Sequence, residues 1–353
     1  PQQWVMLVLA AKQSEDLSVR SLLASIFLLI PAVLLAQGAG KPVIDVHLHA
    51  FGANSMGPYP SYICAPFAQL PAWDQRRPWG ATFGNIQEDA GCTRPIRSQP
   101  DDETLMRRTI HELELHNVIA VAGGSLEYTE AWHAAAPERI LPALHFRLGT
   151  RETSPDEMAS LFESGRIHAL SEVTLQYQGI EPDDPRFEPW LAKLEDIDMP
   201  LGIHIGTGPP GAPYLGDPEY RGRMHSPLSL EEPLIRHPKL RVYVMHAGWP
   251  MLDDTLALMW AHPQVYLGLG VISYALSPDE FHRYLRALVN AGFARRIMFG
   301  SDQMVWPETI GIAIENIASA DYLTEAQKRD ILYNNAARFF RFSDEQIATH
   351  HAF

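Results

Sequence analysis

The stretch "VIDVHLHAFG", residues 43–52, places two histidines within a short apolar run. Its apolar and β-branched residues predict a strand, in which alternate side chains share a face, so that Asp45, His47 and His49 point the same way. Two neutral imidazoles roughly 6 to 7 Å apart on one face can bind a single divalent ion. Hydrogen-bonded core histidines produce the same pattern, so the rest of the chain must decide between packing and chemistry.

After residue 41, short apolar runs alternate with longer amphipathic segments that are typical of helices. Eight strands separated by crossover helices favour a closed (β/α)8 barrel, because parallel strands need such crossovers and a barrel leaves no open edge. An open doubly wound sheet is the rival fold, but no Gly-rich phosphate fingerprint follows the first run. We therefore predict an α/β fold of the TIM-barrel type with strands within residues 43–49, 118–124, 140–146, 167–173, 201–206, 241–248, 265–272 and 296–302.

A long segment rich in Pro, Gly and aromatic residues, residues 50–101, follows the first predicted strand. Connections of that length inside a compact domain are usually functional, and this one would lie on the face where barrel enzymes keep their active sites. We interpret it as a lid or pocket wall. It contains Cys64 and Cys92, which predict a disulfide if the protein is exported, with two buried free thiols as the alternative.

The N-terminal region resembles an export signal. Arg20 precedes the uncharged run "SLLASIFLLIPAVLLA", residues 21–36, and a small-residue stretch follows it. We expect residues 1–38 to comprise a signal peptide and upstream residues, with translation beginning near Val19. An uncleaved membrane anchor is the alternative. The expected location is secreted or periplasmic, and the barrel domain should span residues 41–345 before a frayed tail at residues 346–353.

The chain of 353 residues has a formal net charge of -14, from 28 Lys+Arg and 42 Asp+Glu. This balance argues against nucleic acid or anionic lipid as a partner, since both require clustered cations. We expect a small-molecule substrate and no membrane contact after signal cleavage, and a homodimer is a possible assembly.

Polar residues near the ends of further predicted strands indicate that His47 and His49 are metal ligands and not packing residues. Glu172, His204, His246 and Asp302 each lie late in an apolar run. In a barrel the carboxyl ends of all strands converge, so these side chains would meet the two histidines of the first strand in one small volume. Neutral imidazoles with a carboxylate suit Zn²⁺ or a similar divalent ion, which lowers the pKa of bound water or polarises a carbonyl.

From Val43 to Phe340 the chain resembles the amidohydrolase superfamily, specifically the amidohydrolase-related branch that includes aminocarboxymuconate semialdehyde decarboxylase, the resorcylate decarboxylases and several lactonases. The most specific marks are the His-x-His pair and the last-strand aspartate, with two strand-end histidines between them in the family's order. The segment "NNAARFF", residues 334–340, resembles the family's closing helix.

The resemblance implies roles for the strand-end residues. His47, His49, His204 and Asp302 would hold one divalent ion, Zn²⁺ or another, and a second ion is possible. His246 would be the acid–base or carbonyl-orienting group, and Asp302 would also take a proton from bound water. The role of Glu172 stays open between bridging a second ion, contacting substrate and supporting a ligand.

The function expected from this set is a secreted, metal-dependent hydrolase that attacks an ester, lactone or amide-type carbonyl through a metal-activated water. The alternative is a metal-dependent non-oxidative decarboxylase of an aromatic or unsaturated carboxylic acid. A non-catalytic binding protein is a third class, but every expected ligand is present.

Other side chains near strand ends are candidates for substrate binding, with surface solvation or packing as the alternative for each. An arginine would clamp a substrate carboxylate, and the aromatic residues would line the pocket. These candidates are Arg147, Arg221, Arg223, His225, Trp249, Tyr274 and Trp306.

Overall fold

The computed structural model describes residues 40–84 and 92–353. The expected signal segment and the proposed start near Val19 lie outside the described residues. Residues Ala39–Phe353 form one compact unit. Within the described ranges, no helix is long and apolar enough to cross a membrane.

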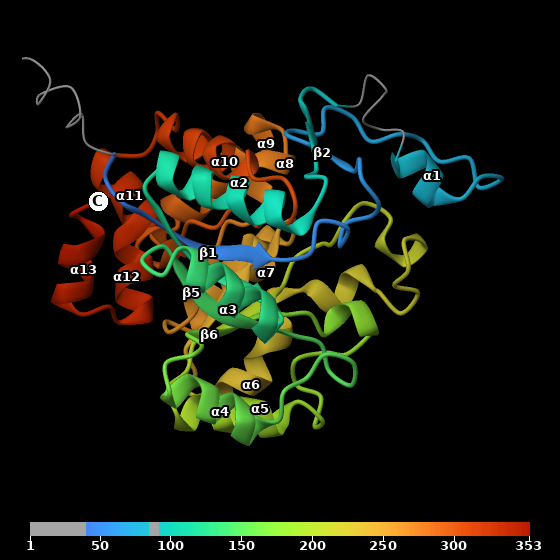
Figure 1. The fold of residues 1–353 in the computed structure, drawn as a ribbon. Coiled ribbons are helices and arrows are strands. Elements are labelled where there is room, and N and C mark those ends of the chain that lie inside the picture. Colours follow the sequence, from blue (N-terminus) through green and yellow to red (C-terminus); the bar gives the residue numbers. More distant parts are fainter. Residues whose placement is uncertain (1–39, 85–91) are drawn as a thin grey trace, which may run out of the picture. The chain divides into compact units, whose positions relative to one another are not determined.

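Eight parallel strands form the central sheet, in the order β1-β4-β5-β6-β7-β8-β9-β10 (Figure 1). This arrangement confirms the predicted barrel. The strands are β1 Val43–Ala50, β4 Val118–Gly124, β5 Ile140–Phe146, β6 Ala169–Val173, β7 Leu201–His204, β8 Val242–Met245, β9 Tyr266–Gly268 and β10 Ile297–Met298.

Helices separate the strands along the chain, as parallel pairing requires. Ser277 caps α9 by accepting a hydrogen bond from the backbone N–H of Glu280, and a proline follows it at the first helical position. The helices between strands are α2 Asp102–Leu115, α3 Leu126–Ala135, α4 Pro155–Glu163, α5 Glu188–Asp196, α6 Glu231–Arg236, α7 Leu252–Ala261, α8 Ile272–Ala275 and α9 Pro278–Asn290. Short 3-10 helices are η2 Gln176–Gln178, η3 Ala212–Tyr214, η4 Gly222–His225, η5 Pro227–Leu230, η6 His246–Gly248 and η7 Ala294–Arg296.

The last two barrel strands are shorter than the apolar runs that predict them. After β9 the backbone reaches a positive φ of 56° at Val271 and continues into α8, so the run at 265–272 is only partly strand. After β10 the run at 296–302 leaves the ladder before Asp302, which also has a positive φ of 55°. An apolar run predicts which residues are buried. After both β9 and β10, buried residues continue beyond the last hydrogen-bonded residue of the strand.

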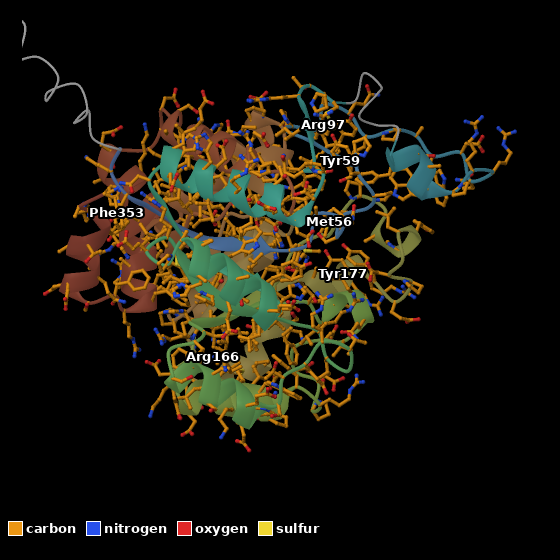
Figure 2. All side chains as sticks on the ribbon, viewed as in Figure 1. Met56, Tyr59, Arg97, Arg166, Tyr177 and Phe353 are labelled. Atoms are coloured by element: carbon orange, nitrogen blue, oxygen red, sulfur yellow. A yellow bond between two sulfur atoms is a disulfide. The ribbon has the colours of Figure 1, made fainter. Side chains whose placement is uncertain are left out.

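The segment after β1 is not structureless. It contains the antiparallel pair β2 (Tyr62–Cys64) and β3 (Pro95–Arg97) and the helix α1 (Trp79–Gly84). Cys64 and Cys92 form a disulfide, with their Cα atoms 5.3 Å apart. The Arg97 guanidinium lies 5.7 Å from the centre of the Tyr59 ring (Figure 2).

Helix α1 reaches the second long loop, which follows β7. The indole N–H of Trp79 donates a hydrogen bond to the backbone oxygen of Pro210, at 2.7 Å. The ring of Trp73 lies 4.7 Å from that of Tyr214, which belongs to the same loop as Pro210. The two long loops are therefore joined by polar and aromatic contacts.

The C-terminal residues differ from the frayed tail expected at 346–353. Helix α13 (Asp344–His350) continues into them, and His350 is buried with its Nδ1 3.0 Å from the Tyr333 hydroxyl. The closing segment 334–340 belongs to the π-helical turn η8 (Asp330–Asn334) and to α12 (Asn335–Phe340). It follows α10 (Thr309–Ala318) and α11 (Glu325–Arg329). In Figure 1, α11, α12 and α13 lie at the end of β1 opposite to α1 and β2.

The barrel closes between its first and last strands through a few backbone hydrogen bonds. The N–H of Val46 donates to Phe299 at 3.1 Å, and the N–H of His49 donates to Gln303 at 2.9 Å. The N–H of Asp302 donates to the carbonyl oxygen of His47 at 2.6 Å. We call this contact between β1 and residues 299–303 the barrel seam.

The Asp45 side chain joins the two sides of the seam. Its Oδ1 accepts hydrogen bonds from the backbone N–H of His47, at 2.9 Å, and of Ser301, at 3.0 Å. Asp45 is fully buried, and this burial raises the pKa of its carboxyl group to about 7 against the opposing effect of the hydrogen bonds from Ser301 and His47. The position therefore needs an acceptor oxygen more than it needs a charge.

We predict that Asp45→Ala lowers the free energy of unfolding by about 2–4 kcal/mol, because it leaves two buried N–H groups without an acceptor. Asp45→Asn, which keeps the acceptor oxygen, should lose much less. Urea unfolding monitored by circular dichroism measures both variants. Equal losses for alanine and asparagine would show that the two hydrogen bonds do not hold the seam.

Candidate metal centre

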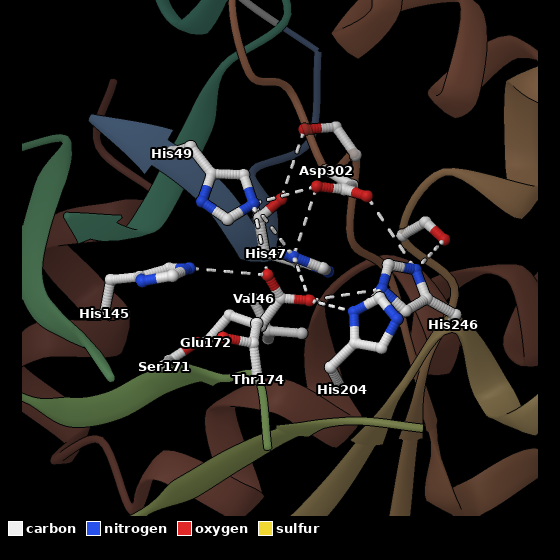
Figure 3. Close-up of polar contacts among 12 residues, drawn as sticks. Val46, His47, His49, His145, Ser171, Glu172, Thr174, His204, His246 and Asp302 are labelled. Carbon is white, nitrogen blue, oxygen red and sulfur yellow. Dashed lines mark hydrogen bonds and ion pairs between the residues drawn. The ribbon is translucent and has the colours of Figure 1, made fainter. Parts of the chain in front are cut away.

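Six ionisable side chains meet at the carboxyl end of the barrel (Figure 3). They come from five strands or the residues that directly follow them, and each residue is only 1% to 7% exposed. The structure brings together all six strand-end residues expected from the sequence: His47, His49, Glu172, His204, His246 and Asp302.

One side of this cluster is built by β1 and the last strand. The Nε2 atoms of His47 and His49 lie 3.2 Å apart. Asp302 Oδ1 lies 2.9 Å from His49 Nε2 and 3.2 Å from His47 Nε2. Two nitrogens and one carboxylate oxygen therefore face a common point.

The other side is built by the ends of β6, β7 and β8. His204 Nδ1 and His246 Nε2 lie 2.9 Å apart. Glu172 Oε1 lies 2.5 Å from His204 Nδ1 and 3.2 Å from His246 Nε2. This is a second group of two nitrogens and one carboxylate oxygen.

Glu172 lies between the two sides. Its Oε1 is 3.8 Å from His47 Nε2, and its Oε2 is 3.9 Å from His49 Nε2. Ligand atoms of Glu172 thus lie within 4.8 Å of those of both histidine pairs. Asp302 also spans the cluster, since its Oδ2 lies 3.8 Å from His246 Nδ1.

The protonation states of His47 and His204 suit a metal ion. Burial lowers the pKa of His47 to about 3, against the opposing charges of Asp302 and Glu172, and burial also lowers the pKa of His204. Burial acts on His246 in the same direction, but Glu172 and Asp302 outweigh it and leave its pKa above the ordinary value. Neutral imidazole is the form that binds a metal.

The carboxylates carry the negative charge of the cluster. Burial raises the pKa of Glu172, but its contacts with His204, His145 and His246 outweigh burial and hold the pKa well below its ordinary value. For Asp302 the neighbouring histidines likewise overcome burial and lower the pKa. Two anionic carboxylates beside the neutral imidazoles of His47 and His204 form a site that favours a divalent cation.

The close contact between the two imidazole Nε2 atoms gives an independent test of this fit. In the described ranges, His47 Nδ1 and His49 Nδ1 have no hydrogen-bond partner, while their Nε2 atoms face each other and Asp302. Two neutral imidazole nitrogens at this distance cannot both donate or both accept. A cation between nitrogen and carboxylate ligands removes that conflict, so the donor set fits a divalent ion such as Zn²⁺.

The backbone around the cluster is shaped for close approach. His246 and Asp302 have positive φ values of 62° and 55°, a region that non-glycine residues occupy mainly where the surroundings hold them. A Cβ atom on Gly270 would lie 2.4 Å from His47 Nδ1, so only glycine leaves room for this imidazole. The backbone at Gly270, two residues after β9, thus packs directly against His47.

Two further residues at the edge of the cluster are absent from the sequence-based prediction. The Tyr177 hydroxyl lies 3.3 Å from His204 Nε2, and His145 Nε2 lies 3.7 Å from Glu172 Oε2. His145 lies near the end of β5, so the strand-end rule that found the other ligands also applies to it. Tyr177 belongs to η2, beyond its strand, and no sequence pattern marks it.

Two of the candidate substrate-binding residues lie beside the cluster. The ring of His225 is 5.5 Å from that of His204, and His225 is fully buried. Burial lowers the pKa of His225 to about 3, so it is neutral. Tyr274 is also fully buried, and its hydroxyl lies 3.4 Å from the backbone oxygen of Asp302, so it packs behind this residue.

The polar groups of four other candidates bond elsewhere. Arg147 pairs with Asp217 at 2.9 Å, and Arg221 donates to the backbone oxygens of Pro218 and Tyr220. The indole N–H groups of the two tryptophans donate to other partners, Trp249 to Glu280 and Trp306 to the backbone of Ser61. Arg223, the remaining candidate, is exposed on η4.

Comparison with known proteins agrees with this fold. The family model described as amidohydrolase matches residues 44–342, which confirms the resemblance found from the motifs. Protein fluG of Emericella nidulans is 23% identical over 169 residues, covering 44% of this chain and 19% of that protein. The chain therefore spans about a fifth of the length of this curated relative.

Several solved structures share the fold. An uncharacterised TIM-barrel protein from Bordetella bronchiseptica superposes with a TM-score of 0.57 at 18% identity, covering 87% of this chain and 99% of that chain. A probable 2-pyrone-4,6-dicarboxylic acid hydrolase from Acinetobacter baumannii has a TM-score of 0.55 at 16% identity, covering 85% and 99%. A 5-carboxyvanillate decarboxylase from Sphingomonas paucimobilis has a TM-score of 0.50 at 16% identity, covering 66% and 82%.

We predict that Zn²⁺ stabilises the folded protein relative to protein stripped with EDTA. A ligand at a hundred times its Kd contributes about 2.7 kcal/mol, which thermal unfolding resolves easily. The double variant His49→Ala/His204→Ala, which removes one nitrogen from each side, should lose this response. An equal rise in melting temperature for the double variant would place the binding site elsewhere.

Proposed function

Because this chain belongs to the amidohydrolase family, we propose that it is a metal-dependent hydrolase of small molecules with an ester, lactone or amide-type carbonyl. The observation that carries the proposal is the position of Glu172 between two pairs of buried histidines. A shared carboxylate with nitrogen ligands on both sides suits two ions, which would supply charge stabilisation for a displacement at a carbonyl. We propose Zn²⁺ as the metal, since the ligands are nitrogen and carboxylate oxygen.

Each side of the cluster supplies its own ligands in this proposal. His47, His49 and Asp302 form one set, His204 and His246 form the other, and Glu172 contributes to both. His246 is then a ligand and not the acid–base group that the family resemblance implies. This assignment follows from the 2.9 Å separation between His246 Nε2 and His204 Nδ1.

A divalent ion held by these residues would lower the pKa of water and polarise a carbonyl oxygen. Asp302 supplies the base. Its Oδ1 faces the two histidines of β1, while its Oδ2 lies 3.8 Å from the nearest His246 nitrogen and remains available to a proton from attacking water. The neighbouring histidines hold Asp302 in the ionised form that accepts this proton.

The surroundings of the cluster favour a small substrate that enters from one direction. The six residues are almost fully buried, so only a compact carbonyl group can reach their ligand atoms. His225 and Tyr177 lie on the His204 side and are proposed to line this approach. We further propose that the protein acts outside the cytoplasm, as the apolar run at 21–36 suggests.

Metal stoichiometry tests the bridging role of Glu172. The purified wild-type protein should bind two Zn²⁺ ions per chain, and Glu172→Gln should retain at most one. Elemental mass spectrometry measures the metal content of both proteins. Glu195→Gln is the matched control, because Glu195 also contacts a histidine, His237, which lies outside the cluster. One ion in the wild type and no change in Glu172→Gln would contradict the two-ion site.

A panel of model substrates tests the reaction. The metal-loaded protein should hydrolyse dihydrocoumarin or 4-nitrophenyl acetate, and Asp302→Ala should lower kcat by on the order of 10³-fold, since a general base contributes this much. The same preparations are assayed for CO2 release from 2,6-dihydroxybenzoate. Decarboxylation without hydrolysis would replace this proposal with a lyase function, and full activity in Asp302→Ala would refute the assigned base.

A further inference from the structure

His145 lies outside the six-residue cluster but faces it. It lies near the end of β5, and its Nε2 points toward Glu172 Oε2 across 3.7 Å (Figure 3). Its ring is 6.0 Å from that of His49 and 5.7 Å from that of Phe51. No role for this histidine follows from the metal ligands described above.

A short turn after β5 holds an arginine against this histidine. Arg147 and Arg151 exchange two backbone hydrogen bonds of 2.8 Å, and Gly149 between them has a φ of 75° that favours glycine. The turn directs the Arg151 side chain back, so that its NH1 lies 3.3 Å from His145 Nδ1. The neighbouring Arg147 points to Asp217 instead.

This contact fixes where the proton of His145 lies. A guanidinium is always charged and can only donate hydrogen bonds, so His145 Nδ1 must be the acceptor. An imidazole that accepts at Nδ1 is neutral and carries its hydrogen on Nε2. His145 therefore presents an N–H donor toward the cluster, whereas a metal ligand presents a lone pair.

The Nε2–H group of His145 does not donate a close hydrogen bond to Glu172. A separation of 3.7 Å exceeds the 2.7–3.2 Å of an N–H···O hydrogen bond, so the N–H group is directed at the cluster without a close bond. The His145 side chain is 10% exposed, against 1% to 5% for the four clustered histidines. Its Nε2 thus lies at the edge of the cluster, next to Glu172 and less deeply buried than the four clustered histidines.

We propose that His145 is a catalytic hydrogen-bond donor to the carbonyl oxygen of the substrate, and that Arg151 is a positioning residue that fixes its tautomer. The proposal rests on the proposed hydrolase function for its substrate, and it deepens that function by assigning a donor to the oxygen on which negative charge develops. Preorganised donors of this kind act most strongly in sites that exclude water. Neither residue changes charge in this role.

Kinetics on the hydrolysed model substrate test the two residues. His145→Phe keeps a flat ring without a donor and should lower kcat by on the order of 10²-fold with a much smaller change in KM. His145→Gln offers an N–H group of similar reach and should recover part of the rate. Metal content and melting temperature should match the wild type in both variants.

The positioning role of Arg151 has its own controls. Arg151→Gln should lower kcat by about tenfold, Arg151→Lys should restore it because a cationic donor returns, and Arg147→Gln should have little effect. Wild-type kcat in Arg151→Gln, or equal losses in Arg151→Gln and Arg147→Gln, would overturn the positioning role.

Two readouts do not depend on turnover. Nitrogen-15 NMR of the Zn²⁺-loaded protein, assigned by difference from His145→Phe, should show His145 protonated on Nε2 in the wild type and as a mixture in Arg151→Gln. Acetohydroxamate, a carbonyl ligand for metal sites, should bind about tenfold more weakly to His145→Phe by calorimetry. Protonation on Nδ1 or unchanged hydroxamate affinity would overturn the inference, even if the wild type fails to hydrolyse the panel and the proposed function itself is wrong.

Discussion

The site depends on the hydrogen-bonded seam between the first and last strands of the barrel. His49 and Asp302 are 253 positions apart in the chain, yet their side chains are 2.9 Å apart because the sheet closes on itself there. The N–H of Asp302 donates to the carbonyl oxygen of His47, and Asp45 accepts hydrogen bonds from both sides of the seam. The same backbone contacts therefore close the barrel and set the distance between the candidate metal ligands.

The electrostatics of the cluster follow from burial. A buried carboxylate without a partner is costly, and Glu172 and Asp302 avoid this cost only through the histidines around them. Burial in turn keeps His47 and His204 neutral, which is the form that binds metal. The arrangement leaves a negatively charged, nitrogen-rich volume, and a divalent cation complements both properties.

Much of this arrangement was predictable from local sequence, and the exceptions have physical causes. Residues such as His204 lie at the ends of apolar runs, and parallel strands bring their carboxyl ends together. The cluster could therefore be inferred from the sequence. The segment 50–101 could not be resolved into β2, β3 and α1, because its contacts, such as Trp79 with Pro210, join distant loops. His350 was expected in a tail and is buried against Tyr333, a contact that only the packed helices create.

The sequence by itself determined the fold class and the identity of the six clustered side chains. The spacing of apolar residues, the length of each strand and the position of a residue at a strand end are all local properties of the sequence. Tertiary structure alone decided how those side chains are arranged in two groups. It paired His204 with His246, placed Glu172 between the two pairs, and turned Arg151 back onto His145. These relations depend on distances of a few ångströms between strands, which are set by barrel closure and side-chain packing and leave no trace in the spacing of residues along the chain.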